Sequence, residues 1–330
     1  MDLPSGRGPL SDYLSSTLRG VPGTLDLIPV ADPTDVADED FQLALYACYE
    51  LHYRSFDGVD DRWEWDPGLL TFRQSLEHAF EDRLRAEVGR IECPPDAVPR
   101  ELWALLESAP PTMSRYIERD ATRSQFLEFV IHRSLYHLRE ADPHTWAIPR
   151  LHGRPKVALV EIQMDEYGSG LVERMHSTLF ASTMIALDLD PSYGAYVDRV
   201  PGTTLATVNL MSMFGLHRRF RAAIVGHLAA FEMSSSSPNR RYAAGARRLG
   251  AAGAAPFFDE HVEADSLHEQ IAANDMAGSL ATQDPSSASE ILFGARSLVY
   301  LDELWASTVL DAWKRGESSL LEPGFATSRA

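Results

Sequence analysis

Stretches with the apolar spacing of a helix face alternate along the chain with short polar or proline-containing connections. From Phe41 on, apolar or aromatic residues recur at positions 41, 45, 49, 53 and 56, the spacing of an amphipathic helix. Asp66 and Pro67 are typical of a helix start, because Asp caps the first backbone N–H groups and proline fits the first turn. Further helices are predicted over residues 99–108, 114–142, 158–189, 204–235, 240–250, 257–275 and 288–316.

The pattern predicts an all-α protein with about seven to nine helices in one domain, because strand-like alternation bounded by hairpin turns is absent from the sequence. Residues 1–35 are rich in Pro, Gly, Ser and Asp and are predicted to form a flexible N-terminal arm. Residues 36–318 are predicted to form the helical domain and residues 319–330 a C-terminal tail. Gly168 and Gly170 could interrupt the helix predicted over 158–189.

The composition favours a small-molecule partner. Thirty basic and 48 acidic residues give a net charge of −18, which argues against binding to nucleic acid or to a membrane surface. Two cysteines are too few for a disulfide framework, and neither a signal peptide nor a membrane-spanning stretch is visible, so a cytoplasmic location is expected. The oligomeric state stays open, with a homodimer as one arrangement. With 11 histidines, 48 acidic residues and only two cysteines, a metal site would use imidazole nitrogen and carboxylate oxygen ligands.

The segment from His261 to His268 carries the most informative cluster. At about 100° per residue, His261, Asp265 and His268 converge on one face of a helix. One helix could therefore chelate a metal with all three residues. The alternative is a solvated polar stripe, although neighbouring apolar residues such as Phe257 and Phe258 favour a partly buried cluster.

A second cluster contains Glu173 and His176, one helical turn apart, with Glu166 seven residues before Glu173. These three residues would share a face if the helix is continuous. A carboxylate-x-x-His pair thus occurs twice, as Glu173/His176 and Asp265/His268. Pairs of this type on inward-facing helices build di-iron and di-manganese sites.

Such a site needs another carboxylate from a neighbouring helix, and spacing alone does not choose between Glu140 and Glu128. Arg133, His132, Tyr136 and Tyr167 are candidate pocket residues because they lie near the predicted ligands. Nucleotide-binding glycine motifs, a GxSxG motif and an HExxH motif are missing from the sequence. The nitrogen- and oxygen-rich cluster is therefore the only candidate site for chemistry.

These motifs, their spacing and the stretches at 60–70, 140–153, 161–170 and 214–238 resemble the heme-oxygenase-like diiron oxidase/oxygenase superfamily, also described as iron-containing redox enzymes. The resemblance covers roughly residues 40–300. It implies a heme-oxygenase-like bundle of about seven core helices that holds two non-heme irons in place of heme. The ligands it implies are Glu140, Glu173, His176, His261, Asp265 and His268, with Glu166 as a conditional seventh.

The resemblance also implies O2 as co-substrate, Fe2+ and Fe3+ states, and an external reductant, with no catalytic group beyond the metal ligands. N-oxygenation of an amino acid or amine in a biosynthetic pathway is the favoured reaction. Desaturation, oxidative C–C cleavage with decarboxylation, and a ferritin-like iron carrier are the alternatives. Heme degradation and thiamin hydrolysis are disfavoured, the second because Cys48 is predicted to be a core residue and not a nucleophile.

Overall fold

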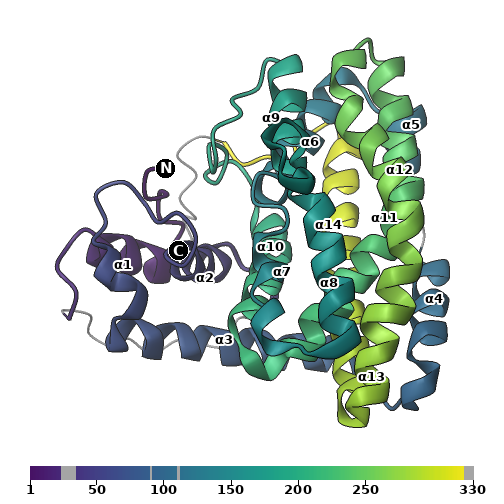
Figure 1. Ribbon diagram of the computed structural model, residues 1–330. Coiled ribbons are helices and arrows are strands. Elements are labelled where there is room, and N and C mark those ends of the chain that lie inside the picture. The colour runs from purple at the N-terminus through teal and green to yellow at the C-terminus, as the bar shows by residue number, and fades with distance from the viewer. Residues whose placement is uncertain (24–34, 90, 110–111, 323–330) are drawn as a thin grey trace.

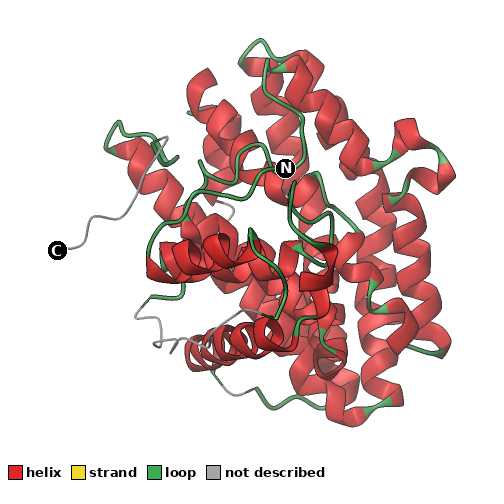
Figure 2. Ribbon diagram, turned by 90° about the vertical axis from the view of Figure 1, so that its left-hand side faces the viewer, coloured by secondary structure: helices red, strands yellow, loops and turns green. Residues whose placement is uncertain are grey.

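Helices form every regular element in the part of the chain that the computed structural model describes (Figures 1 and 2). That part comprises residues 1–23, 35–89, 91–109 and 112–322, and for residues 263–267 it includes the backbone only. The all-α prediction is confirmed. The α-helices are α1 Pro9–Leu18, α2 Glu39–Glu50, α3 Pro67–Val88, α4 Val98–Ser108, α5 Thr112–Arg119, α6 Arg123–His137, α7 Asp142–Thr145, α8 Gly153–Glu166, α9 His176–Ala186, α10 Gly202–Leu216, α11 Arg221–Arg248, α12 Pro256–Gln270, α13 Ser279–Gln283 and α14 Ala288–Lys314.

The long helix α11 forms the centre of the bundle and packs along α12 and α14 (Figure 1). The crossing of α11 and α14 is close because a glycine lies on each helix. A Cβ atom at Gly226 would overlap the carbonyl of Ile291, and one at Gly294 would overlap the carbonyl of Ala223. Glycine lowers helix propensity, so these two residues reduce the local stability of their helices. Their missing Cβ atoms allow the two backbones to pack closely.

Helix boundaries follow local capping chemistry where the sequence provides it. The Asp66 side chain accepts a hydrogen bond from the Leu69 N–H, and Pro67 is the first residue of α3, as predicted. The helix predicted over 114–142 is instead two helices, because Thr122 and Gln125 form a capping box that starts α6. The helix predicted over 204–235 also divides, with α10 ending at Leu216 and α11 starting at Arg221.

Part of the predicted N-terminal arm is helical. Residues 9–18 form α1, whose Leu14 and Leu18 are buried, and Arg7 makes a 2.6 Å ion pair with Glu39 of α2. The predicted tail also begins in contact with the bundle, because the Leu321 N–H donates to the Arg199 carbonyl. Residues 24–34 and 323–330 lie outside the described residues. The domain boundaries themselves stay a prediction.

No helix within the described ranges combines the length and apolar character needed to cross a membrane.

His132 of α6 is a buried neutral histidine that couples the fold to pH. Its Nδ1 lies 2.7 Å from the Thr204 hydroxyl and its Nε2 lies 2.9 Å from the Ser319 hydroxyl. Burial, with a smaller contribution from the Arg133 charge, lowers the pKa of His132 to about 3. The unfolded chain therefore takes up a proton near pH 6.5 that the folded chain takes up only near pH 3.

The folded state should consequently lose stability as the pH falls from about 6.5 towards 3, because only the unfolded state binds the proton in this interval. We expect His132→Gln to remove this contribution, worth about 2 kcal/mol between pH 6.5 and pH 5. Urea unfolding of both proteins at pH 7 and pH 5 measures it. An equal loss of stability in the variant and the wild type would contradict the assignment.

Candidate metal centre

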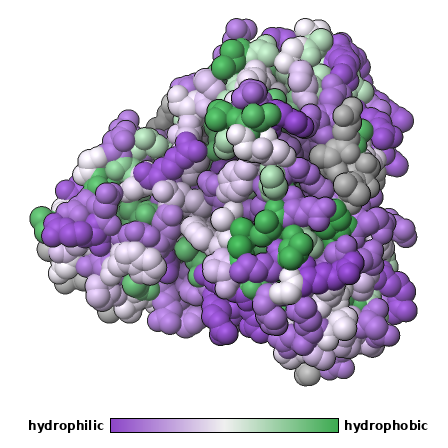
Figure 3. Space-filling model, viewed as in Figure 1, coloured by the Kyte–Doolittle hydropathy of each residue, from purple (hydrophilic) through white to green (hydrophobic). Residues whose placement is uncertain are grey.

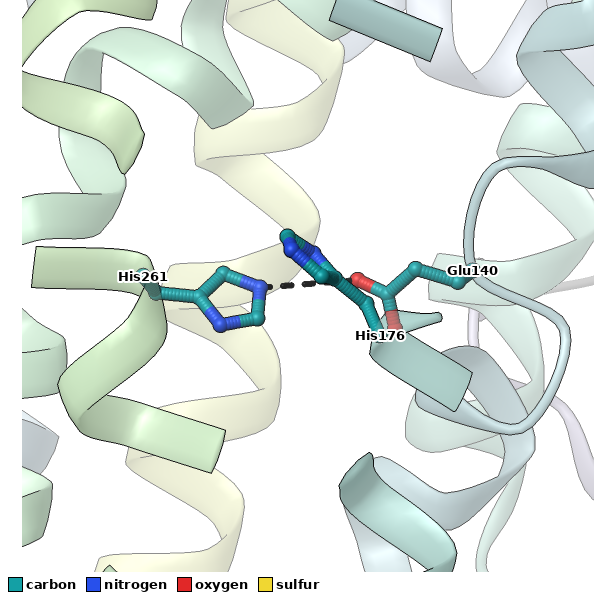
Figure 4. A group of neighbouring side chains, drawn as sticks. All are labelled: Glu140, His176 and His261. Atoms are coloured by element: carbon teal, nitrogen blue, oxygen red, sulfur yellow. Dashed lines mark ion pairs between the residues drawn. The ribbon is translucent and has the colours of Figure 1, made fainter. Parts of the chain in front are cut away.

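Glu140, His176 and His261 form the first of two buried groups that could hold a metal ion. One potential ligand atom from each residue lies within 4.8 Å of the others. Glu140 follows the C-terminus of α6, His176 is the first residue of α9, and His261 lies in α12. Figure 4 shows His261 approaching from one side and Glu140 with His176 from the other. Three segments far apart in the sequence thus meet at one buried point.

The local hydrogen bonds orient His261 as a metal ligand requires. Its Nδ1 lies 2.8 Å from the Phe257 carbonyl, which only accepts, so Nδ1 carries the proton. In the neutral ring Nε2 then carries the lone pair, and it faces Glu140 Oε1 at 3.8 Å. The rings of His176 and His261 are 4.3 Å apart. A backbone contact therefore sets the tautomer of one imidazole, as is usual for histidines that bind metals.

Glu140 is held as a buried carboxylate. Its backbone has a φ of 41°, in the left-handed region that non-glycine residues rarely adopt. His137 Nδ1 lies 3.0 Å from its Oε2. Burial alone would raise the pKa of Glu140, but His137 and His261 outweigh burial and hold the pKa at about 2. An ionised, partly strained carboxylate at the meeting point of three segments is suited to bind a cation.

The second group consists of Glu166, Glu232 and His268, again with ligand atoms within 4.8 Å of one another. Glu166 ends α8, Glu232 lies in the middle of α11, and His268 lies near the end of α12. His268 Nδ1 lies 3.1 Å from Glu232 Oε2, and its Nε2 lies 3.0 Å from Asp165 Oδ2. Glu166 and Glu232 are 7% and 6% exposed, so their charges repel at close range unless a cation lies between them.

The two groups touch each other through His176 and Glu166. His176 Nδ1 lies 2.9 Å from Glu166 Oε2, and the two side chains form an ion pair. Burial lowers the pKa of His176, but the Glu166 charge outweighs it, and the pKa is raised overall. This contact brings one member of each group side by side. The donors, imidazole nitrogens and carboxylate oxygens, are those that iron accepts in non-heme sites.

Glu173 lies apart from both groups. The helix predicted over 158–189 is not continuous, because Gly168, Ser169 and Gly170 have left-handed φ angles of 65°, 52° and 84° and end α8. A Cβ atom at Gly168 would lie 2.5 Å from the Met175 nitrogen, so the turn requires glycine. Glu173 is exposed in the short 3₁₀ helix Val172–Arg174. The one-face arrangement with Glu166 and His176 is absent here, and ligation by Glu173 stays a prediction.

The other residues that the sequence suggested for the site are not among the described members of either group. Asp265 lies in α12 between His261 and His268, but its side chain is outside the described residues. Glu128, the alternative to Glu140, accepts hydrogen bonds from Trp313 and Ser319 and belongs to neither group. His132 also contacts neither group, while Tyr167 donates to Asp142 at 2.8 Å.

Sequence reasoning missed His137 and Glu232. Glu232 did carry a signal, because it is the only acid in the apolar run from position 222 to position 233, where a carboxylate needs a partner. His137 lies three residues before Glu140, which is helical contact distance, but the helix ends at His137 itself. Their roles depend on how α6, α11 and α12 pack together.

A cavity of about 490 Å³ opens next to both groups. Glu140, Glu166, Glu232 and His261 are among its lining residues. The remaining wall combines aromatic and charged side chains. It includes Phe129, Tyr136, Phe231, Phe258, Arg133, Asp302, Glu303 and Arg241. Of the sequence candidates for the pocket, Arg133 and Tyr136 therefore do line it.

The fold and site together define an all-α protein with two adjacent histidine–carboxylate groups beside a cavity of substrate size. The model of the iron-containing redox enzyme family, which is heme-oxygenase-like, matches residues 127–303, more than half of the chain and the segment that holds both groups. The protein belongs to this family and is an iron-dependent oxidoreductase. No curated protein matches the chain.

Glu232 provides a test that separates the second group from the first. We expect Glu232→Gln to weaken iron binding at the second group by at least about 10-fold, because it removes a charge beside His268 and Glu166. Titration of the anaerobic protein with Fe(II) measures the change. Glu303→Gln, at an exposed glutamate of the same cavity wall, is the matched control. Equal iron affinity in the Glu232→Gln variant and the control would remove Glu232 from the site.

Proposed function

We propose that the protein is a non-heme diiron oxygenase that uses O2 and an external reductant to oxidise a small metabolite, with N-oxygenation of an amine or amino acid as its reaction. The 2.9 Å approach of His176 to Glu166 carries this proposal, because it makes two candidate metal positions neighbours. Glu140, His176 and His261 would hold one iron, and Glu166, Glu232 and His268 the other. The bound irons would supply reductive activation of dioxygen.

The surrounding residues support oxidation of a bound substrate over simple iron storage. A carrier needs an ion path, whereas this site opens into a cavity of about 490 Å³ with several aromatic side chains in its wall. Phe129, Phe231 and Phe258 lie on these walls. A metabolite bound there would lie beside the candidate ligands that line the cavity.

The charges beyond the two groups favour a cationic substrate such as an amine. Glu107, Glu269, Asp302 and Glu303 line the cavity, against Arg133 and Arg241. Arg133 already pairs with Asp302 at 2.7 Å. The acidic excess, on a chain with a net charge of −18, raises the local concentration of cations.

Oxygen consumption by the Fe(II)-loaded protein tests this function. We expect amines or amino acids to accelerate O2 uptake, and 18O2 to place labelled oxygen on the substrate nitrogen. A matched set of carboxylic acids without the amine is the control. A dehydrogenated or shortened product would replace N-oxygenation by desaturation or C–C cleavage. Uptake that no substrate changes would support the ferritin-like carrier.

A further inference from the structure

Helix α8 exposes an apolar stripe on its outer face. Val157, Val160 and Met164 follow helical spacing and are 66%, 41% and 59% exposed. The opposite face of the same helix buries Leu159 and Ile162 in the core. A surface helix of a monomer normally has a polar outer face. In α8 both faces carry apolar side chains, and only the inner face packs against the core.

Apolar side chains are concentrated at this place on the molecule. Of the eight large hydrophobic residues that are exposed in the described ranges, five lie on or just after α8 and a sixth lies near the end of α9. Beyond the stripe they are Leu171, Val172 and Ile185. Figure 3 shows apolar residues gathered over α8 and α9 on this face. Single exposed hydrophobic residues are ordinary, whereas a concentration of this kind marks an interaction surface.

The charges beside the stripe are complementary to those of a second copy of the same helix. Arg154 lies near the start of α8 and the exposed Glu161 lies in its second half, on the same flank at about 100° per residue. Asp165 shares this flank, but its carboxylate already lies 3.0 Å from His268 Nε2. A two-fold axis through the middle of the stripe reverses the helix direction but keeps this flank on the same side. Arg154 of each copy then lies on the same side of the interface as Glu161 of the other. The guanidinium already pairs with Asp275 at an exposed position, but it has further N–H donors to offer.

We propose that the protein forms a homodimer in which α8 packs antiparallel against α8 of a second copy. The apolar stripes cover each other, and Arg154 of each helix lies on the same side as Glu161 of its partner. Antiparallel helix dipoles favour the same arrangement. The interface ends next to Glu166, the last residue of α8, and includes Leu171 and Val172 beside Glu173. Dimerisation would therefore cover the segment that joins the two parts of the metal centre.

Light scattering coupled to size-exclusion chromatography tests this dimer. We expect the wild type at twice the mass of one chain and Val160→Glu/Met164→Glu at the mass of one chain. Val21→Glu adds the same charge at another exposed valine, which is 63% exposed and distant from α8 in the sequence, and should stay dimeric. A monomeric wild type, or a double variant that dimerises as well as the wild type, would overturn the proposal.

A charge exchange tests the antiparallel order independently. Arg154→Glu should weaken the dimer, and adding Glu161→Arg should restore it, because the pairs across the two-fold axis are then reversed. A double variant weaker than either single variant would contradict this order. Circular dichroism checks that each variant is folded, and iron content is measured on the same samples. The dimer rests on the surface of α8 and not on the iron chemistry, so either can fail without the other.

Discussion

Replacing His261 with alanine should lower the bound iron from about two ions per chain to about one. His261 supplies the only α12 ligand of the first group among the described side chains, and its Nδ1–H contact with Phe257 holds the ring in place. Its loss leaves Glu140 and His176 without the third donor, whereas the second group keeps all of its members. Iron analysis after anaerobic loading and desalting measures the result.

Two further variants show whether the loss of iron is specific to the first group. His78→Ala, at an exposed histidine of α3, removes an imidazole elsewhere and should leave iron binding unchanged. His261→Ala/His268→Ala removes a ligand from each group and should abolish iron binding. Wild-type iron content in the His261→Ala protein would show that the first group does not bind iron.

Glu50→Ala should destabilise the fold by about 3–5 kcal/mol, because it leaves a buried arginine without its counter-charge. Arg139 and Glu50 pair at 2.6 Å, with side chains 1% and 0% exposed. Tyr193 donates to the same carboxylate oxygen at 2.9 Å, and the Arg139 guanidinium lies over the Tyr53 ring. Urea unfolding of the metal-free protein at pH 7 measures the loss.

Arg139 directly precedes Glu140, whose φ is 41°, so we expect the pair to anchor the turn that presents Glu140. Glu50→Leu/Arg139→Met removes both charges, so it should recover most of the stability lost in Glu50→Ala. It should still bind iron more weakly than the wild type, because the turn that presents Glu140 has lost its anchor. Full stability in Glu50→Ala would show that the pair contributes little to folding.

The sequence predicts the helices well because apolar spacing and capping residues act locally. The start of α3 at Asp66 and Pro67 is an example. The sequence also points to α12 as a ligand helix, since His261 and His268 share a face wherever that helix packs. What it could not supply is the packing of α11 against α12, which turns Glu232 towards His268.

The segment between α8 and α9 is a second place where the sequence pattern did not predict the structure. Helical spacing placed Glu166, Glu173 and His176 on one face, but the helix ends at Glu166, just before three consecutive left-handed residues at positions 168–170. His176 still meets Glu166, because the chain folds back through the close contact of Gly168 with Met175. A contact made by such a reversal depends on tertiary geometry that periodicity does not contain.

A crystal structure of the protein loaded anaerobically with Fe(II), with anomalous scattering recorded at the iron edge, tests the central claim most directly. The account predicts two neighbouring anomalous peaks in each chain. One should lie among Glu140, His176 and His261 and the other among Glu166, Glu232 and His268. A single peak, or iron bound away from these six side chains, would contradict it.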